Sequence, residues 1–324
     1  MSKNENDDLE RIDKIENLQL MYPRLQEILK KMNDCLNSRV SPEPRSMLVT
    51  GFPGVGKTKM YERFLHNYPR REEADATIVP VLSTIIPSRA SVKGLVTKLL
   101  YTLGDPMADR GTEVQQTIRL QHLLQAAKTE LIILDEFQHF IDRDSYKVLQ
   151  SSSDWLKNLL NETGIPLVLI GMPSCKLVLD ANPQLKRRFS VQNELKPFEW
   201  SNQSAKNEVR PMLAIIEKML PLKKPSHLSD PDTAYRIYCA TAGVMGSIMK
   251  LVRGAAKMAI ESGVEQITLE NLDQVYEVEL ASNAPEYPSP FEQNKKTIEP
   301  LALERLMGQY MFENKSRRRK RLYA

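Results

Sequence analysis

The sequence predicts an α/β fold in which a parallel sheet is flanked by helices and followed by a small helical domain. Short apolar runs alternate with segments of helical periodicity up to about residue 198, which is typical of a doubly wound parallel sheet. The segment TELIILDEF at 129–137 contains four consecutive apolar residues, as expected of a central strand covered on both faces. After residue 198 the strand signals stop and helical segments take over.

The elements follow one another in a regular order. Helical periodicity begins at 18–37 and is broken by SPEP. Strands are expected at 46–51, 77–86, 129–137, 165–173 and 191–198. Helices are expected at 92–103, 145–162, 176–182, 183–189, 204–220, 230–243, 246–263 and 268–280. The predicted domains are a helical segment at 1–40, an α/β domain at 41–199, a helical domain at 200–281, and a linker, terminal helix and basic tail at 282–324.

Composition narrows the class of protein. The 324 residues are 41% hydrophobic and 27% charged, and no segment approaches the roughly 20 apolar residues that span a bilayer. The polar, acidic start MSKNENDDLERIDKIEN argues against a secretory signal. The cysteines Cys35, Cys175 and Cys239 are widely spaced and form neither a disulfide framework nor a metal pair. We therefore expect a cytoplasmic protein with no membrane association.

The net charge of +4 is unevenly distributed, because the chain starts acidic and ends in NKSRRRKRLYA. A basic tail of this kind is either solvated or attracted to a polyanion such as DNA. The sequence leaves both interpretations open.

A phosphate-binding loop follows the first expected strand. The stretch GFPGVGKTKM satisfies G-x-x-x-x-G-K-[ST], a pattern in which glycines let backbone N–H groups point at a phosphate and a helix start adds partial positive charge. Lys57 is expected to reach the β- and γ-phosphates, and the Thr58 hydroxyl to ligate Mg²⁺. The predicted nucleotide-binding residues are Gly51, Pro53, Gly54, Val55, Gly56, Lys57, Thr58, Lys59 and Asp135.

The second half of the site is an acidic pair in LIILDEFQHF. The apolar run places Asp135 and Glu136 at the carboxyl end of a buried strand, about eighty residues after the phosphate loop. There Asp135 can hold Mg²⁺ through water, and Glu136 can polarise the attacking water. Together with the loop, the pair predicts an ATPase that takes ATP and Mg²⁺.

The acidic pair and the helical domain after the sheet resemble the AAA+ ATPases, in which that domain is called the lid. NPQLKRRF at 182–189 resembles the arginine-finger segment of that family. The resemblance implies that Arg188, with Arg187 as the alternative, completes the site of a neighbouring copy in a ring or filament.

Two further AAA+ features match less well. Gly171 and Ser174 are the candidates for the residue that senses the γ-phosphate. In the lid, Ser247 stands where many relatives carry arginine, and Lys250 or Arg253 are the candidate substitutes.

Several strings together resemble the TniB/TnsC group of transposition ATPases: GFPGVGKT, LIILDEFQHF, LVLIGMP, NPQLKRRF and TAGVMGSIMKLV. The resemblance covers roughly residues 20–265 and implies a bacterial protein similar in role to the Mu phage B protein. Such proteins form homo-oligomers on duplex DNA in their ATP-bound form and recruit a transposase. A target selector of the TniQ/TnsD type, sometimes with an RNA-guided complex, loads them.

The resemblance also implies DNA along the inner surface of a filament. Two clusters are the candidate contacts: Ser88, Arg89, Ser91 and Lys93 in the first, and Arg110, Thr112 and Arg119 in the second. Basic and hydroxyl side chains suit phosphate contacts that do not read sequence, although a solvated helix end explains either cluster as well.

Two other functions remain open. A replication initiator or helicase loader would also be an AAA+ ATPase, although no winged-helix reader follows the lid. A P-loop kinase or other phosphotransferase would need a pocket for a small acceptor, and the sequence carries no signature of one.

Overall fold

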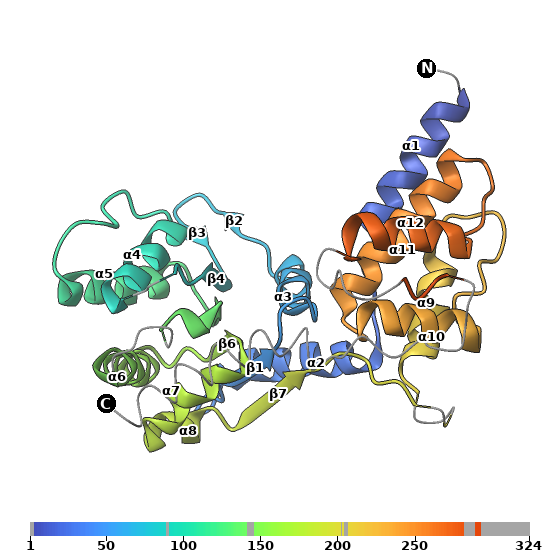
Figure 1. The fold of residues 1–324 in the computed structure, drawn as a ribbon. Coiled ribbons are helices and arrows are strands. Elements are labelled where there is room, and N and C mark those ends of the chain that lie inside the picture. The colour runs from blue at the N-terminus through green and yellow to red at the C-terminus, as the bar shows by residue number, and fades with distance from the viewer. Residues whose placement is uncertain are drawn as a thin grey trace. The chain divides into compact units, whose positions relative to one another are not determined.

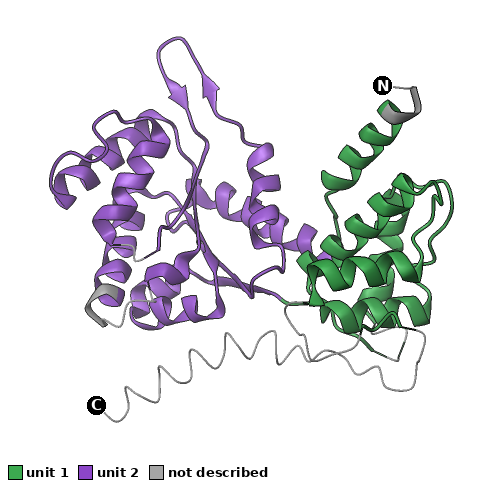
Figure 2. Ribbon diagram, turned by 45° about the horizontal axis from the view of Figure 1, so that its top comes forward, with its two compact units in different colours: residues 1–22, 196–324 green, residues 23–195 purple. Residues whose placement is uncertain are grey.

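The computed structural model describes residues 3–88, 91–140, 146–201, 203, 207–281 and 289–292. The chain divides into two compact units (Figure 2). Pro23–Leu195 forms one, the sheet unit, and Met1–Tyr22 with Lys196–Ala324 forms the other, the helical unit. The segment 1–40 is therefore shared between the units, since α1 (Lys3–Glu16) lies in the helical unit and α2 (Pro23–Asn37) in the sheet unit.

Five parallel strands form the main sheet of the sheet unit, in the order β4-β5-β6-β1-β7 (Figure 1). They are β1 (Met47–Gly51), β4 (Val81–Ile85), β5 (Leu131–Asp135), β6 (Leu167–Gly171) and β7 (Val191–Leu195). Every residue of β1, β5 and β6 is buried. Because successive side chains point to opposite faces, the sheet is covered on both sides, which confirms the predicted fold class.

Helices fill the connections between these strands. They are α3 (Lys57–His66), α4 (Val92–Leu103), α5 (Glu113–Ala126), α6 (Tyr146–Thr163), α7 (Lys176–Asp180) and α8 (Pro183–Arg188). One buried cluster joins side chains of α4 to α8 with alternate residues of β1, β4, β5 and β6. Local signals fix the helix starts: Ser91 caps α4, Thr112 forms a capping box on α5, and Asn182 caps α8 with Pro183 in its first turn.

The strand expected at 77–86 is in fact two strands. β3 (Thr77–Ile78) pairs antiparallel with β2 (Arg71–Glu72) in a small hairpin that stands out from the sheet (Figure 2), and β4 begins only at Val81. Pro80 separates β3 from β4 because it has no N–H for a ladder, while its carbonyl accepts from the Glu130 N–H at 2.8 Å. Likewise α2 begins at Pro23, later than the expected 18, because proline favours the first helical position.

The helical unit contains α1, α9 (Val209–Met219), α10 (Pro231–Thr241), α11 (Met245–Glu261) and α12 (Leu269–Glu279). α11 packs against α1, α10 and α12 through a buried apolar face, so this unit fits an AAA+ lid. The Arg11 guanidinium in α1 pairs with the Glu265 carboxylate and donates to the Pro221 carbonyl at 2.7 Å. Within the described residues no helix is long and apolar enough to cross a membrane. The predicted terminal helix and basic tail lie outside the described residues.

Candidate nucleotide site

The phosphate loop connects β1 to α3 and is shaped by its glycines. A Cβ on Gly51 would lie 2.6 Å from the Leu195 carbonyl oxygen and 2.8 Å from Val55 Cγ2, so no larger residue fits there. Gly54 and Gly56 have φ of 78° and 96°, a backbone region that favours glycine. Gly56 is the N-cap of α3 and provides no side-chain cap, which leaves the first N–H groups of this helix available to an anion.

Lys57 is buried beneath the loop, with 8% of its surface exposed. Its Nζ donates to the carbonyl oxygens of Gly51 at 2.8 Å and Phe52 at 3.0 Å. Burial lowers the pKa of Lys57, although the nearby carboxylates of Glu136 and Asp135 act in the opposite direction. An ammonium whose hydrogen bonds go to neutral carbonyl oxygens can be drawn to the stronger charge of a phosphate.

Lys59 differs from Lys57 although only Thr58 separates them. Its side chain is exposed and its Nζ pairs with Glu62 at 2.8 Å. Only its backbone N–H, in the first turn of α3, remains a candidate for phosphate contact. Pro53 lies exposed in the loop, and Val55 packs beneath it as a buried side chain.

Thr58 and Asp135 bring the two halves of the site together. The Thr58 hydroxyl donates to Asp135 Oδ2 at 3.1 Å, and the Glu136 N–H donates to Asp135 Oδ1 at 2.8 Å. Burial raises the pKa of Asp135, partly offset by these hydrogen bonds. Mg²⁺ usually keeps several of its waters in proteins. The Thr58 hydroxyl could therefore ligate the ion directly, while the Asp135 carboxylate beside it could hold one of the ion's waters, so the two residues fit a magnesium site.

Glu136 follows the end of β5 with a left-handed backbone, φ 56°, which is uncommon for a residue with a side chain and recurs at functional sites. Its carboxylate accepts a hydrogen bond from the Gln138 amide. Gln138 was not among the predicted site residues, and neither was Tyr61, whose pKa is raised by burial and by the nearby Asp135. The only sequence signal for Gln138 was its place two residues after Glu136.

Arg188 lies far from this site in its own chain. The Ser46 N–H donates to the Arg188 carbonyl at 2.9 Å, so α8 ends beside the amino end of β1, whereas the phosphate loop follows the carboxyl end. Five strand residues span about 16 Å. The Arg188 guanidinium donates to Asn161 Oδ1 at 3.3 Å, while Arg187 is exposed. Neither arginine can therefore complete the site of its own chain.

The sensor candidates have different surroundings, and Gly171 has no polar side chain. Gly171 ends β6, and Ser174 lies in the short turn η3 (Pro173–Cys175). In the helical unit, Lys250 pairs with Glu279 at 3.1 Å, and Arg253 donates to the Leu18 carbonyl at 2.7 Å. Both long basic side chains thus hold elements of that unit together.

Comparison with protein families identifies the chain. Residues 11–200, more than half of the sequence, match the family described as Bacterial TniB protein. The chain belongs to the TniB family. A search of curated proteins found no match.

Solved structures extend the comparison of this TniB-family chain to its fold. Cdc6p from Pyrobaculum aerophilum has a TM-score of 0.58 at 16% identity, covering 81% of this chain and 69% of that one. Orc1 of Aeropyrum pernix in complex with DNA has a TM-score of 0.56 at 18% identity, and the match covers 81% of this chain and 67% of Orc1. Drosophila ORC bound to DNA has a TM-score of 0.54 at 13% identity, and the match covers 84% of this chain and 66% of the ORC chain. The chain is a TniB-type AAA+ ATPase by family and fold, and this class implies ATPase activity.

The four basic residues among the predicted DNA contacts of the TniB-family chain have different surroundings. Arg89 lies outside the described residues. Lys93 is exposed in the first turn of α4, and the Arg110 side chain is 76% exposed beside Asp109. Arg119 instead pairs with Asp105 at 2.6 Å and donates to the Met107 carbonyl at 2.6 Å. It therefore stabilises the connection between α4 and α5.

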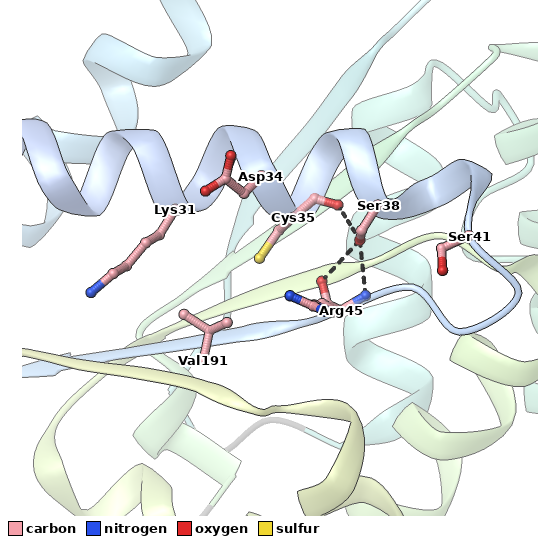
Figure 3. Close-up of a pocket in the computed structure, with 7 residues that line it drawn as sticks. All are labelled: Lys31, Asp34, Cys35, Ser38, Ser41, Arg45 and Val191. Atoms are coloured by element: carbon pink, nitrogen blue, oxygen red, sulfur yellow. Dashed lines mark hydrogen bonds between the residues drawn. The ribbon is translucent and has the colours of Figure 1, made fainter.

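A separate pocket of about 300 Å³ lies between α2 and the strands β1 and β7 (Figure 3). Two of its polar side chains have partners, since Lys31 donates to Asn193 Oδ1 at 2.9 Å and the Ser38 hydroxyl accepts from the Arg45 N–H at 2.8 Å. Burial raises the pKa of Cys35 to about 12, so its thiol stays neutral and unreactive.

Proposed function

We propose that this protein is an ATP-dependent regulator of DNA transposition in the bacterial cytoplasm. It binds ATP with Mg²⁺, forms a ring or helical filament on duplex DNA without reading its sequence, and recruits the transposase. A TniQ/TnsD-type selector, alone or with an RNA-guided complex, directs it to the target. The observation that carries the proposal is the contact between Thr58 and Asp135 in a TniB-family chain, because it joins the phosphate loop to the acidic pair.

Each part of the nucleotide site has a role in this proposal. The loop N–H groups and Lys57 bind the phosphate chain, and Thr58 and Asp135 hold Mg²⁺. The ion neutralises charge on the phosphates when it is bound. Glu136 orients and polarises the attacking water.

Assembly controls the rate in this proposal, because neither Arg187 nor Arg188 can reach the nucleotide site of its own chain. Arg188, or its exposed neighbour Arg187, is expected to reach the nucleotide of the next copy. An arginine supplied in trans is worth about 10³ to 10⁵ in rate in other phosphoryl-transfer sites. An isolated copy would therefore hydrolyse ATP slowly.

Mixing two inactive variants tests this arrangement. Arg188→Ala keeps an intact phosphate loop, and Lys57→Ala keeps an intact finger. If the finger acts in trans, each variant alone is inactive and the mixture regains part of the DNA-stimulated ATPase rate. Arg187→Ala is the matched control that decides between the two arginines. No recovery in mixtures with either arginine variant would contradict a finger supplied in trans.

DNA binding is proposed through Lys93 and Arg110, with Arg89 as a further candidate. The structures of Orc1 and Drosophila ORC, which are similar in fold, were solved in complex with DNA. This favours duplex DNA as the polyanion that the chain binds. Contacts to phosphates release counterions, so affinity should fall steeply with salt and vary little with sequence. Lys93→Glu and Arg110→Glu should weaken binding to all duplexes and reduce the salt dependence. Arg119→Ala should mainly destabilise the α4–α5 connection.

Electron microscopy with duplex DNA and a slowly hydrolysed ATP analogue tests the proposal as a whole. Long oligomers should form with nucleotide and DNA, Lys57→Ala should abolish them, and Glu136→Gln should make them persist with ATP. A chain that stays monomeric under these conditions would exclude the proposed function.

A replication initiator or helicase loader is the second candidate, favoured by the likeness to Cdc6p and ORC. Identities of 13% to 18% in these comparisons show the fold alone. Capture of a replicative helicase by the ATP-bound protein, with no capture of a transposase, would favour this alternative.

A further inference from the structure

The Gln138 side chain bridges the ends of two neighbouring strands. Its amide nitrogen donates to Glu136 Oε2, beyond the end of β5, and its amide oxygen accepts from the Met172 N–H at 3.0 Å, beyond the end of β6. A backbone N–H can only donate, so the oxygen of the Gln138 amide must face Met172. The NH₂ group must then face the Glu136 carboxylate.

The backbone that carries Gln138 is held firmly in place. Gln138 lies in the short turn η2 (Phe137–Phe140), whose two phenylalanines are fully buried. The His139 ring Nδ1 lies 2.7 Å from the Ile86 carbonyl oxygen, and the His139 N–H donates to the Glu136 carbonyl at 3.0 Å. A side chain on such an anchored turn can fix the position of its partner.

Gly171 leaves the space that the Gln138 amide occupies. A Cβ at this position would lie 2.5 Å from Gln138 Oε1 and 2.5 Å from Cys175 Sγ. Any larger residue at the end of β6 would therefore displace the amide. The Gln138 amide can occupy its position only because residue 171, 33 positions later in the sequence, is a glycine.

We propose that Gln138 is a positioning residue for ATP hydrolysis. It fixes the orientation of the Glu136 carboxylate and ties it to the end of β6. The inference rests on the proposed role of Glu136 in orienting the attacking water. Because Gln138 acts through Glu136, its loss should change the rate of hydrolysis and leave nucleotide binding intact.

Steady-state ATPase kinetics of the full chain test this role. Gln138→Met keeps the length of the side chain and removes both hydrogen bonds, and Gln138→Ala is the second variant in case one of them folds poorly. We expect kcat to fall at least tenfold, while KM and the Kd of a fluorescent ATP analogue stay within twofold. Gln121→Met is the matched control, because Gln121 also donates to a glutamate, Glu162, on the surface; it should leave kcat unchanged.

A double variant separates positioning from a merely structural role. In the Glu136→Gln background, Gln138→Met should cost less than twofold further in a single-turnover assay, because its target carboxylate is already absent. An unchanged kcat in the single variant, or an equal loss in both backgrounds, would overturn the inference.

These outcomes are distinct from a failure of the proposed function. A wild-type chain that hydrolyses ATP but never assembles on DNA would end the transposition proposal and leave the kinetic result on Gln138 valid. A Glu136→Gln variant that hydrolyses ATP at the wild-type rate would overturn the inference itself.

Discussion

Two clusters of buried charge, one in each unit, use the same kinds of residue in opposite ways. In the helical unit, Arg11 and Glu265 pair directly, and their side chains are 9% and 12% exposed. The pairing lowers the pKa of Glu265 to about 2 and raises that of Arg11. In the sheet unit, burial dominates: it lowers the pKa of Lys57 and raises that of Asp135.

The opposite directions separate a cluster that holds the fold from one that awaits a ligand. The Arg11–Glu265 pair satisfies its own charges, so folding favours their ionised forms. Burial disfavours the charged forms of Lys57 and Asp135. A triphosphate would supply the negative charge that Lys57 lacks, and Mg²⁺ the positive charge that Asp135 lacks. Removing a charge from the Arg11–Glu265 pair should therefore destabilise the folded protein. Removing the charge of Lys57 or Asp135 should leave its stability nearly unchanged.

The largest expected effect is on nucleotide binding in Lys57→Met. Loss of the ammonium should weaken ATP binding at least about 1,000-fold, or about 4 kcal/mol, because the phosphates lose their main cationic partner. The melting temperature without nucleotide should not fall, since the methionine keeps the buried stem and removes an unpaired charge. Calorimetric titration and thermal unfolding measure the two quantities. Lys59→Met, two residues on, is the control and should bind ATP nearly as the wild type does.

Glu265→Gln should have the next largest effect, on the stability of the helical unit. Removing Glu265 leaves Arg11 without its buried carboxylate partner, with only the half-exposed Asp8 to balance its charge, and costs about 3 kcal/mol in unfolding free energy. Hydrogen exchange at α1 and α11 measures this loss. Asp8→Asn removes a half-exposed partner of the same arginine and should cost less than about 1 kcal/mol. Equal costs for both variants would remove the contrast between the clusters.

The pH dependence of that loss provides a further test. Folding lowers the pKa of Glu265 from its ordinary value of 4.5 to about 2, so its contribution to stability is fully present above pH 4.5. The contribution decreases as pH falls from there toward 2, because the unfolded chain binds the proton first. The difference in stability between wild type and Glu265→Gln should therefore be constant from pH 7 to 5 and shrink at pH 3. A difference that grows on acidification would contradict the assigned pairing.

The smallest effect is expected for Asp135→Asn without nucleotide. Because folding raises the pKa of Asp135, its ionised form is a cost above that pKa, and a neutral amide should change stability by less than about 1 kcal/mol, in the stabilising direction. Urea unfolding at pH 8 checks the sign. ATP hydrolysis should nevertheless be lost, so a clear destabilisation would show that Asp135 holds the fold as well.

Local signals explain why much of the sheet unit could be predicted. The phosphate loop is read from consecutive residues, and β5 from four apolar residues before Asp135. Pro80 was visible in the sequence, but the apolar residues on both sides concealed the break between β3 and β4. α1 falls within the helical segment predicted at 1–40, but helical periodicity was read only from residue 18, because Leu9, Ile12 and Ile15 are few apolar residues in a polar, acidic stretch.

Contacts between distant parts of the chain could not be predicted. Arg11 and Glu265 lie 254 residues apart, and nothing near either residue indicates the other. Gln138 reaches Met172 only because β5 and β6 are neighbours in the sheet. The proposed sensor substitutes Lys250 and Arg253 are occupied by partners on α12 and before α2, which periodicity alone does not reveal.

The membership of α1 in the helical unit has a consequence for synthesis on the ribosome. The first helix leaves the exit tunnel long before its partners α11 and Glu265 have been translated, whereas residues 23–195 can fold as soon as they emerge. Until α11 and Glu265 have been translated, α1 must remain exposed or be shielded by a chaperone. Its polar, charged sequence would keep the exposed helix soluble.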